Sequence, residues 1–300
     1  MKLGVIDVGT NSCRLLIMEN TDRGWREIKK DLIITRLGEG VDKNGQLNEK
    51  AMLRTFKAIY RFLAEMDEAG VKKKTIIGTS ALRDVSNADI LLELLRTKTG
   101  LGIDIIDGEK ETYLNYLGAG NEYSLLIDIG GGSTELIWKQ SNEIVFKSIN
   151  MGAVRMTERY ITNPASIINM NELEEMRNNI KGLIKEKLSF NIKKSLNSVA
   201  GMGGTITTIG AIDQRLEEYQ PEKIEGYTIS LEKVKDILCN LSAMILNEKK
   251  KVPGLQPGRA DIIIAGVVIL ESIMNMLEIQ QLTITEHDLL YGVIRDIYGR

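Results

Sequence analysis

Two patterns of hydrophobic positions alternate along the chain. Short apolar runs predict buried strands, and longer segments with apolar residues three or four positions apart predict helices. Residues 48–69 follow the helical pattern, and Gly70 can end that helix. The predicted strands cover residues 2–6, 14–19, 26–34, 74–79, 102–106, 125–128, 135–138, 143–149, 198–200 and 282–285. The predicted helices cover residues 48–69, 87–99, 109–118, 171–188, 230–246, 259–277 and 286–298, and a further helix begins at Thr205. Because strands and helices alternate after each of two three-strand openings, the sequence predicts mixed α/β domains.

The first hairpin of the three-strand opening is repeated in the sequence. Residues 6–15 (IDVGTNSCRL) align without a gap with residues 127–136 (IDIGGGSTEL). The offset of about 120 residues is far longer than a solenoid repeat, which indicates two duplicated domains. We place the first domain at residues 1–120, joined by the terminal helix 286–300, and the second at residues 121–285. A cleft between the two domains is the expected place for a site.

Each repeated hairpin has a turn of small residues between two strands. Glycine lets main-chain amides approach a ligand closely, and serine and threonine add hydroxyl donors, so such turns suit phosphate oxygens. An ordinary β-hairpin also favours glycine and asparagine, but each copy here follows an aspartate, at Asp7 and Asp128. A third glycine-rich turn, at residues 200–206, leads into a helix, whose N-terminus can bind an anion. The spacing of this turn differs from the dinucleotide fingerprint, which disfavours a dehydrogenase.

The composition limits the classes of partner. The 300 residues carry a net charge of −2 and include 5% aromatic residues, which disfavours binding of a nucleic acid polymer by stacking. No segment resembles a signal peptide or is long enough to cross a bilayer, so the sequence predicts a cytoplasmic protein with no membrane contact. Cys13 and Cys239 lie far apart, which disfavours a thiolate metal site. The sequence leaves the oligomeric state open, with a homodimer as one alternative.

Seven motifs occur in the order of one known family. They are DVGTNSxR at 7–14, GTSALRD at 78–84, GEKE at 108–111, DIGGGSTE at 128–135, MGAVR at 151–155, GMGGT at 201–205, and PGL with RAD within 253–261. Together they resemble the exopolyphosphatase/guanosine pentaphosphate phosphohydrolase (Ppx/GppA) family, in its short form without a C-terminal helical domain. The resemblance implies two actin-like (ribonuclease H-like) α/β domains. It also implies removal of terminal phosphate from inorganic polyphosphate or guanosine pentaphosphate.

The resemblance assigns roles to four acidic residues. Glu111 matches the family's catalytic base, which would orient a water molecule for attack on the terminal phosphorus. Asp128 and Glu135 match the acids of the second phosphate loop, and Asp7 matches the acid of the first. The implied cofactor is Mg²⁺ or another divalent cation, held by these last three carboxylates.

The resemblance also assigns phosphate-binding groups. Arg83 is implied in catalysis, and Arg14 and Arg259 in substrate binding, because guanidinium groups offset phosphate charge. A structural pair of Arg259 with Asp261 is an equal alternative, and Arg155 is a weaker candidate. The loop residues implied to contact phosphate are Gly9, Thr10, Asn11, Ser12, Gly130, Gly131, Gly132, Ser133, Thr134, Gly203, Gly204 and Thr205.

The remaining charged residues favour no other chemistry. His287 is the only histidine, which leaves no Ser-His-Asp set, and its place at a predicted helix start favours a surface or capping role. The lysine runs 72–74 and 249–251 are interpreted as solvated faces, with a basic track for polyphosphate as the alternative.

Two other functions stay open beside phosphate hydrolysis. One is a sugar-kinase-like phosphotransferase, and the other is a non-catalytic sensor of polyphosphate or of the guanosine nucleotide. Glu111 favours water as the attacking group, and a pure sensor would not need Glu111, Asp128 and Glu135. The family's usual GLREG segment reads DLLYG at residues 288–292, so its arginine and glutamate contacts are not carried over.

Overall fold

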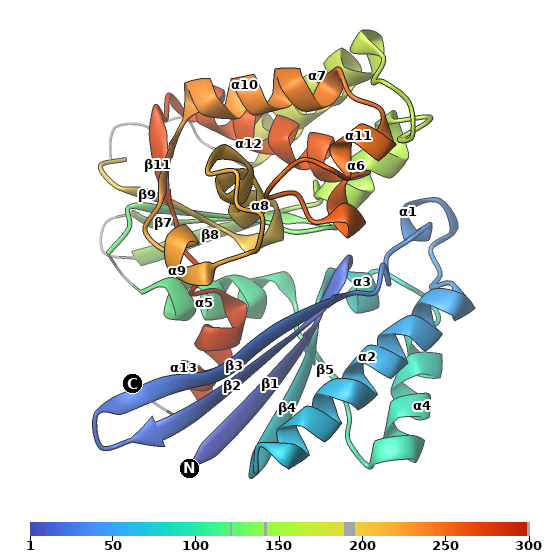
Figure 1. Ribbon diagram of the computed structural model, residues 1–300, viewed down its shortest axis with the longest axis vertical. Coiled ribbons are helices and arrows are strands. Elements are labelled where there is room, and N and C mark those ends of the chain that lie inside the picture. The colour runs from blue at the N-terminus through green and yellow to red at the C-terminus, as the bar shows by residue number, and fades with distance from the viewer. Residues whose placement is uncertain (121, 141–142, 189–195, 299–300) are drawn as a thin grey trace. The chain divides into compact units, whose positions relative to one another are not determined.

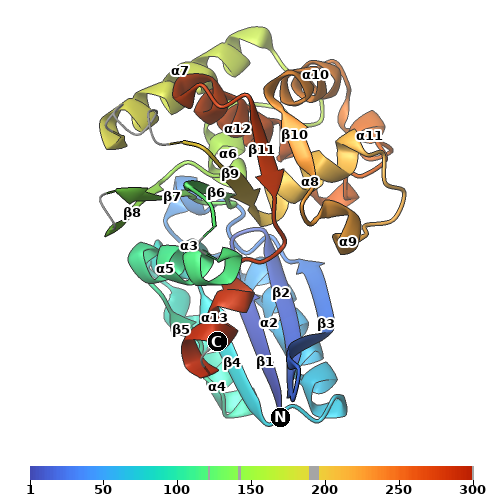
Figure 2. The same ribbon diagram turned by 90° about the vertical axis from the view of Figure 1, so that its left-hand side faces the viewer.

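The computed structural model describes residues 1–120, 122–140, 143–188 and 196–298. The chain forms two compact units, one of Met1–Gly118 with Leu289–Arg300 and one of Ala119–Asp288. Figures 1 and 2 label the strands and helices of the two units. Residues 121, 299 and 300, which the predicted domains and terminal helix include, lie outside the described residues.

The first unit is built on a five-stranded sheet in the order β3-β2-β1-β4-β5. Its strands are β1 (Lys2–Val8), β2 (Ser12–Thr21), β3 (Gly24–Ile34), β4 (Lys73–Gly78) and β5 (Asp104–Ile105). Strands β1, β2 and β3 form an antiparallel meander, whereas β4 runs parallel to β1 and β5 runs parallel to β4. The loops that follow β1 and β4 therefore leave the sheet at the same edge.

Helices cover both faces of this sheet. They are α1 (Val41–Asn44), α2 (Glu49–Glu68), α3 (Ser80–Arg83), α4 (Ala88–Thr99), α5 (Gly108–Ala119) and α13 (Leu289–Tyr298). On one face, Phe62 of α2 and Leu91 of α4 belong to the buried cluster with the strands. On the other face, Leu114 of α5 and Leu290 of α13 pack with Leu3 of β1. Figure 2 shows α13 in front of the sheet and α2 behind it.

The second unit is built on a six-stranded sheet in the order β10-β11-β9-β6-β7-β8. Its strands are β6 (Leu125–Ile129), β7 (Thr134–Gln140), β8 (Glu143–Ile149), β9 (Val199–Met202), β10 (Thr228–Ser230) and β11 (Gln281–Ile284). The five strands β8-β7-β6-β9-β11 repeat the order and the directions of β3-β2-β1-β4-β5. The predicted duplication of a mixed α/β domain is therefore confirmed, with β10 as an additional strand.

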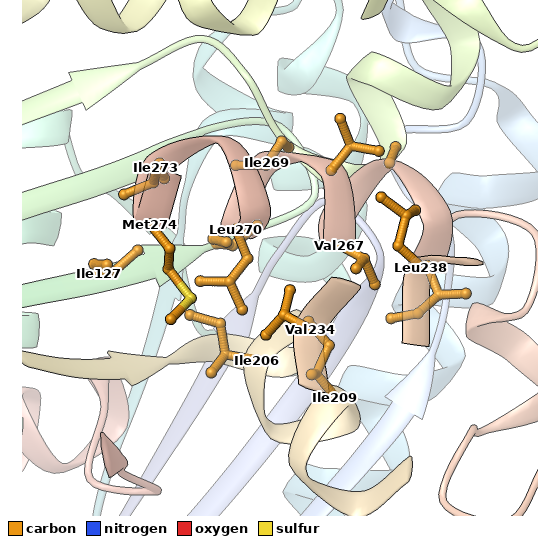
Figure 3. Close-up of a cluster of buried hydrophobic side chains, with 14 of the residues drawn as sticks. Ile127, Ile206, Ile209, Val234, Leu238, Val267, Ile269, Leu270, Ile273 and Met274 are labelled. Atoms are coloured by element: carbon orange, nitrogen blue, oxygen red, sulfur yellow. The ribbon is translucent and has the colours of Figure 1, made fainter. Parts of the chain in front are cut away.

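The core of the second unit surrounds one buried helix. The helices are α6 (Ala153–Tyr160), α7 (Met170–Lys187), α8 (Gly203–Asp213), α9 (Pro221–Ile224), α10 (Leu231–Ser242), α11 (Leu246–Lys249) and α12 (Ile263–Leu277). Figure 3 shows Leu270 and Met274 of α12 close to Ile206 of α8 and Ile127 of β6.

Among the described residues, no helix is both long and apolar enough to cross a membrane.

Three predicted helix boundaries are wrong. Residues 259–262 do not belong to the buried helix, because Arg259 ends a 3-10 turn (Pro257–Arg259) in which its amide bonds to Gln256 O at 2.8 Å. The predicted helix over residues 230–246 ends at Ser242. A second helix then begins after Ile245, whose amide donates to the Glu248 carboxylate at 3.0 Å.

The terminal helix begins three residues later than predicted. The amide of Glu286 donates to the Glu225 carboxylate at 2.6 Å, and the amide of His287 donates to Thr285 Oγ1 at 3.2 Å. These side-chain bonds hold residues 286–288 in a non-helical path, so α13 starts at Leu289. His287 therefore precedes the helix and does not lie within its first turn.

Lys249 is one of the most deeply buried long side chains in the second unit. Its side chain is inside the protein, with 1% of the residue exposed, and its Nζ donates to Pro164 O at 3.4 Å. Burial lowers the pKa of Lys249, and the Asp261 carboxylate opposes this shift. The prediction that the whole run 249–251 is a solvated face is therefore wrong for its first member.

Because Lys249 is buried, the free energy of unfolding should depend on pH in the alkaline range. The pKa of Lys249 is lower in the folded protein than in the unfolded chain, so the unfolded chain binds this proton more strongly. The protonated lysine therefore destabilises the folded state, and this destabilisation is lost as pH rises toward the pKa of the unfolded chain. We expect the free energy of unfolding of the wild type, relative to that of Lys249→Met, to increase between neutral pH and about pH 10. Urea unfolding at several pH values measures this difference. Lys250 is the exposed neighbour, so Lys250→Met is the control. The free energy of unfolding of the wild type relative to Lys250→Met should not change over this pH range. An equal change relative to both variants would contradict the assignment to Lys249.

Candidate functional site

The two repeated hairpins have the same turn geometry. The amide of Gly9 donates to Ser12 O at 3.0 Å, and the amide of Gly130 donates to Ser133 O at 3.0 Å. A Cβ atom at Gly9 would lie 3.1 Å from Ser12 O, and a Cβ atom at Gly130 would lie 3.2 Å from Ser133 O. A side chain at either glycine would therefore crowd the turn, which explains why both copies keep glycine there.

Main-chain amides at the tips of these turns are available to a ligand. Within the described ranges, nothing accepts a hydrogen bond from the amides of Thr10 and Asn11, or from those of Gly131 and Gly132. The side-chain Nδ2 of Asn11 is also buried without an acceptor among the described residues. A buried donor with no partner costs free energy that an anionic oxygen would recover. The predicted phosphate-binding role of these turns fits this donor set.

Strand register places charged side chains opposite each other at the base of each hairpin. Asp7 lies across from Arg14, and Asp128 lies across from Glu135. In the first hairpin, Arg14 Nη2 lies 2.6 Å and Arg14 Nε 2.7 Å from Asp7 Oδ2. The first hairpin thus carries an ion pair, whereas the second carries two carboxylates at the equivalent positions.

The second hairpin carries two carboxylates, the type of ligand that a hard divalent cation prefers. Glu135 is 1% exposed, and its Oε1 accepts a hydrogen bond from Ser148 Oγ at 2.8 Å, which fixes the carboxylate. In the part of the chain that the structure describes, no group of three or more His, Cys, Asp or Glu side chains forms a protein-only metal site. Mg²⁺ is commonly held by one or two carboxylates with water and phosphate oxygens as the other ligands. Asp128 and Glu135 fit that pattern, while the predicted role of Asp7 as a ligand competes with its ion pair to Arg14.

The third glycine turn, Arg259 and Asp128 lie together in the second unit. A Cβ atom at Gly203 would lie 2.2 Å from Asp128 Oδ1, and a Cβ atom at Gly204 would lie 2.4 Å from both terminal nitrogens of Arg259. Arg259 is 7% exposed, and its Nε donates to Gln256 Oε1 at 3.0 Å. Since Gly203 and Gly204 begin α8, the guanidinium lies at the positive end of an 11-residue helix. The guanidinium and the start of the helix attract a phosphate, whereas the Asp128 carboxylate beside them repels it unless a cation lies between the two anions.

Helix α6, which the sequence patterns did not predict, holds the Gly130–Gly132 turn. The amides of Ala153 and Val154 donate at 2.9 Å to the carbonyl oxygens of Gly130 and Gly131, and Arg155 Nε donates to Gly132 O at 2.8 Å. The Thr134 hydroxyl donates to Met151 O and is fully buried. Arg155 and Thr134 therefore stabilise the loop. The MGAVR motif at residues 151–155 is the sequence feature that could have indicated these contacts with the Gly130–Gly132 turn.

In the first unit, Glu111 and Arg83 form an ion pair. Arg83 Nη1 donates to Glu111 Oε2 at 3.3 Å and to Ile106 O at 2.9 Å. Glu111 lies in the first turn of α5 and is 8% exposed. The bonded guanidinium helps to fix the position of this carboxylate.

The short helix that carries Arg83 is connected to the first hairpin. Thr10 Oγ1 and Ser80 Oγ lie 3.0 Å apart, and the amide of Thr79 donates to Val8 O at 3.3 Å. The structure therefore brings the turn of the first hairpin, Arg83 and Glu111 into one region of the first unit.

Burial raises the pKa of the Cys13 thiol well above its usual value, so this residue next to Arg14 is a neutral thiol.

Comparison with known proteins adds an independent line of argument. A profile of the Ppx/GppA phosphatase family matches residues 16–300, so the match begins within β2, just after the repeated segment at residues 6–15. The chain is 37% identical to the bifunctional 3-dehydroquinate synthase/phosphatase of Fusobacterium nucleatum, in an alignment that covers 96% of this chain and 45% of that protein. This chain therefore spans less than half the length of that relative.

Two further relatives and a solved structure are similar over almost the whole chain. Exopolyphosphatase 2 of Mycobacterium tuberculosis is 28% identical, with 99% of both chains covered. The guanosine-5'-triphosphate,3'-diphosphate pyrophosphatase of Pseudoalteromonas translucida is 29% identical over 97% of this chain and 58% of its own length. The crystal structure of an exopolyphosphatase from Cytophaga hutchinsonii is 25% identical and has a TM-score of 0.88, with 99% of this chain and 97% of that chain covered.

Proposed function

Because the chain belongs to the Ppx/GppA phosphatase family, we propose that it hydrolyses the terminal phosphoanhydride bond of inorganic polyphosphate, of guanosine pentaphosphate, or of both. The observation that carries this proposal is the buried Glu111 carboxylate, held by Arg83 next to a phosphate turn of the first unit. The relatives named exopolyphosphatase and guanosine-5'-triphosphate,3'-diphosphate pyrophosphatase support the same reaction class.

In the proposed reaction, Glu111 accepts a proton from a water molecule as the water oxygen attacks the terminal phosphorus. A new P–O bond forms to the water oxygen, and the bond from phosphorus to the bridging oxygen breaks. The bridging oxygen keeps the electron pair and becomes a terminal oxygen of the shortened substrate. Arg83 holds Glu111 in position in the first unit. Within the second unit, Arg259 and the turn that begins α8 offer donors for phosphate oxygens.

Asp128 and Glu135 are the residues proposed to hold Mg²⁺ or another divalent cation. Such a cation, when bound, would supply positive charge that offsets the negative charge of the phosphate oxygens. The fixed Glu135 carboxylate and the contact of Asp128 with the first residue of α8 support this assignment.

The cytoplasmic location and the homodimer considered from the sequence stay predictions.

The purified protein should release orthophosphate in the presence of Mg²⁺. We expect release from polyphosphate, from guanosine pentaphosphate, or from both, with water as the only acceptor. A colorimetric phosphate assay with the two substrates side by side measures this release. If phosphate left the donor only when a sugar or carboxylic acid acceptor was added, the phosphotransferase function would replace the hydrolase. Tight binding of both substrates without turnover would instead indicate the sensor.

A further inference from the structure

A row of polar side chains crosses three neighbouring strands of the second sheet. The register pairs Asp128 of β6 with Glu135 of β7, and Glu135 with Ser148 of β8. Residues directly opposite each other on antiparallel strands project from the same face of the sheet, so these three side chains lie next to one another. Ser148 Oγ donates a hydrogen bond to Glu135 Oε1 at 2.8 Å. Ser148 belongs to none of the seven sequence motifs, so the family resemblance gives it no role.

The first unit contains the same row with different side chains. Its register pairs Asp7 with Arg14, and Arg14 with Leu32. Arg14 binds the Asp7 carboxylate, and the third position carries an apolar leucine in place of a hydroxyl group. The duplicated scaffold therefore accepts an apolar residue at this position. A hydroxyl group occurs in the copy whose middle residue is a carboxylate, which connects Ser148 to the chemistry of Glu135 and not to the formation of the strand.

Burial makes the bond between Ser148 and Glu135 a strong constraint. Glu135 is 1% exposed, so bulk water competes little for its carboxylate. An ionised carboxylate only accepts hydrogen bonds, and the hydroxyl group is therefore the donor. Hydrogen bonds to a charged acceptor are shorter and stronger than bonds between neutral groups. The bond from Ser148 thus restricts the rotation of the Glu135 carboxylate and engages its Oε1 atom.

The two common divalent cations differ in how they use a carboxylate. Ca²⁺ takes about six to eight oxygen ligands in a flexible geometry and can bind both oxygens of one carboxylate. Mg²⁺ is smaller, requires a nearly octahedral arrangement, and keeps several water molecules beside one or two carboxylates. Coordination of a cation by both oxygens of Glu135 would require the carboxylate to turn, and Oε1 would have to leave or share its bond to Ser148. The bond therefore disfavours Ca²⁺ more than it disfavours Mg²⁺.

We propose that Ser148 determines the cation specificity of the second hairpin. By engaging Glu135 Oε1, Ser148 disfavours coordination through both carboxylate oxygens and so favours Mg²⁺ over Ca²⁺. Ser148 acts through Glu135 and is therefore a positioning residue. The inference deepens the proposed function and rests on its assignment of the divalent cation to Asp128 and Glu135.

The test compares the binding of the two cations to the protein in the absence of substrate. Mn²⁺ serves as the probe, because its electron paramagnetic resonance signal reports its binding, and displacement by Mg²⁺ or Ca²⁺ gives a Kd for each cation. We expect Ser148→Ala to lower the ratio of the Ca²⁺ Kd to the Mg²⁺ Kd by about tenfold, comparable to the loss of a residue that orients a metal ligand. The matched pair Ser148→Thr and Ser148→Val has one shape and differs in the hydroxyl group. Ser148→Thr should keep the ratio within about twofold of the wild type, whereas Ser148→Val should lower it as Ser148→Ala does.

The outcomes separate this inference from the proposed function. An unchanged ratio in Ser148→Ala and Ser148→Val would overturn the inference, and so would an equal change in Ser148→Thr and Ser148→Val, which would assign the effect to the size of the side chain. If Glu135→Gln left Mn²⁺ binding unchanged, the cation assignment would fail and the inference with it, while phosphate release by the wild type would still support the hydrolase. If the wild type released phosphate from neither substrate, the proposed function would fail. A ratio that depends on the Ser148 hydroxyl group would then still support the inference.

Discussion

Replacement of Glu111 by glutamine should lower kcat for phosphate release by about two to four orders of magnitude, the usual contribution of a general base. Glutamine has the same shape and can still accept the hydrogen bond from Arg83, but it cannot take a proton from water. We therefore expect KM to change little, because the phosphate-binding turns and Arg259 are intact. Steady-state kinetics with the preferred substrate measure both quantities.

The matched control for this substitution is Glu109→Gln. Glu109 lies two residues earlier in α5 and is exposed, whereas Glu111 is buried. Its substitution should leave kcat within about twofold of the wild type, as expected for a solvated surface charge. Thermal unfolding of both variants separates a catalytic loss from a loss of folding. A folded Glu111→Gln protein with wild-type kcat would remove Glu111 from the mechanism.

Replacement of Glu135 by glutamine should make the protein require much more divalent cation. The substitution keeps the size of the side chain and its bond to Ser148 Oγ, but removes one of the two facing carboxylate charges of the second hairpin. We expect the Mg²⁺ concentration for half-maximal activity to rise by about tenfold or more, together with a lower maximal rate. Titration of activity with Mg²⁺ measures this shift.

Glu143→Gln on β8 is the control for Glu135→Gln. Glu143 is exposed at the start of the strand that pairs with β7, so its loss removes the same charge away from the hairpin turn. The Mg²⁺ dependence of this variant should match that of the wild type. An unchanged Mg²⁺ dependence in Glu135→Gln would show that the cation is not held at this position, and the two-carboxylate assignment would then be abandoned.

Local parts of the structure follow from the sequence because their causes are local. The helix predicted at residues 48–69 forms as α2, which begins where the Asn48 side chain accepts a hydrogen bond from the Lys50 amide at 2.8 Å. The repeat of the two hairpins is visible in the sequence because the residues that close each turn are only three positions apart, so the same short pattern occurs in both copies. The duplication and the family are accordingly recoverable from the sequence.

Two predictions failed because contacts between residues far apart in the sequence decide the outcome. Glu225 binds the amide of Glu286 and delays the terminal helix, and no periodicity near residue 286 indicates it. The lysine run 249–251 looks uniform in the sequence, yet Lys249 is buried by the path of the chain around α11 while Lys250 and Lys251 are exposed. Short runs of like charge therefore do not reveal which member the core encloses.

The sequence by itself determined the two Asp-x-Gly hairpins, their difference at Arg14 and Glu135, and the candidate base. Hairpin register depends on neighbouring residues, so these features are present in the local pattern. Only the tertiary structure decided that Arg83 bonds to Glu111, 28 positions away, and that Arg259 lies against Gly204 at the start of α8. The first contact arises because the parallel strands β4 and β5 end at the same edge of the sheet and bring the segments after them together. The second arises because the chain between α11 and α12 packs against the start of α8, and no short segment specifies either contact alone.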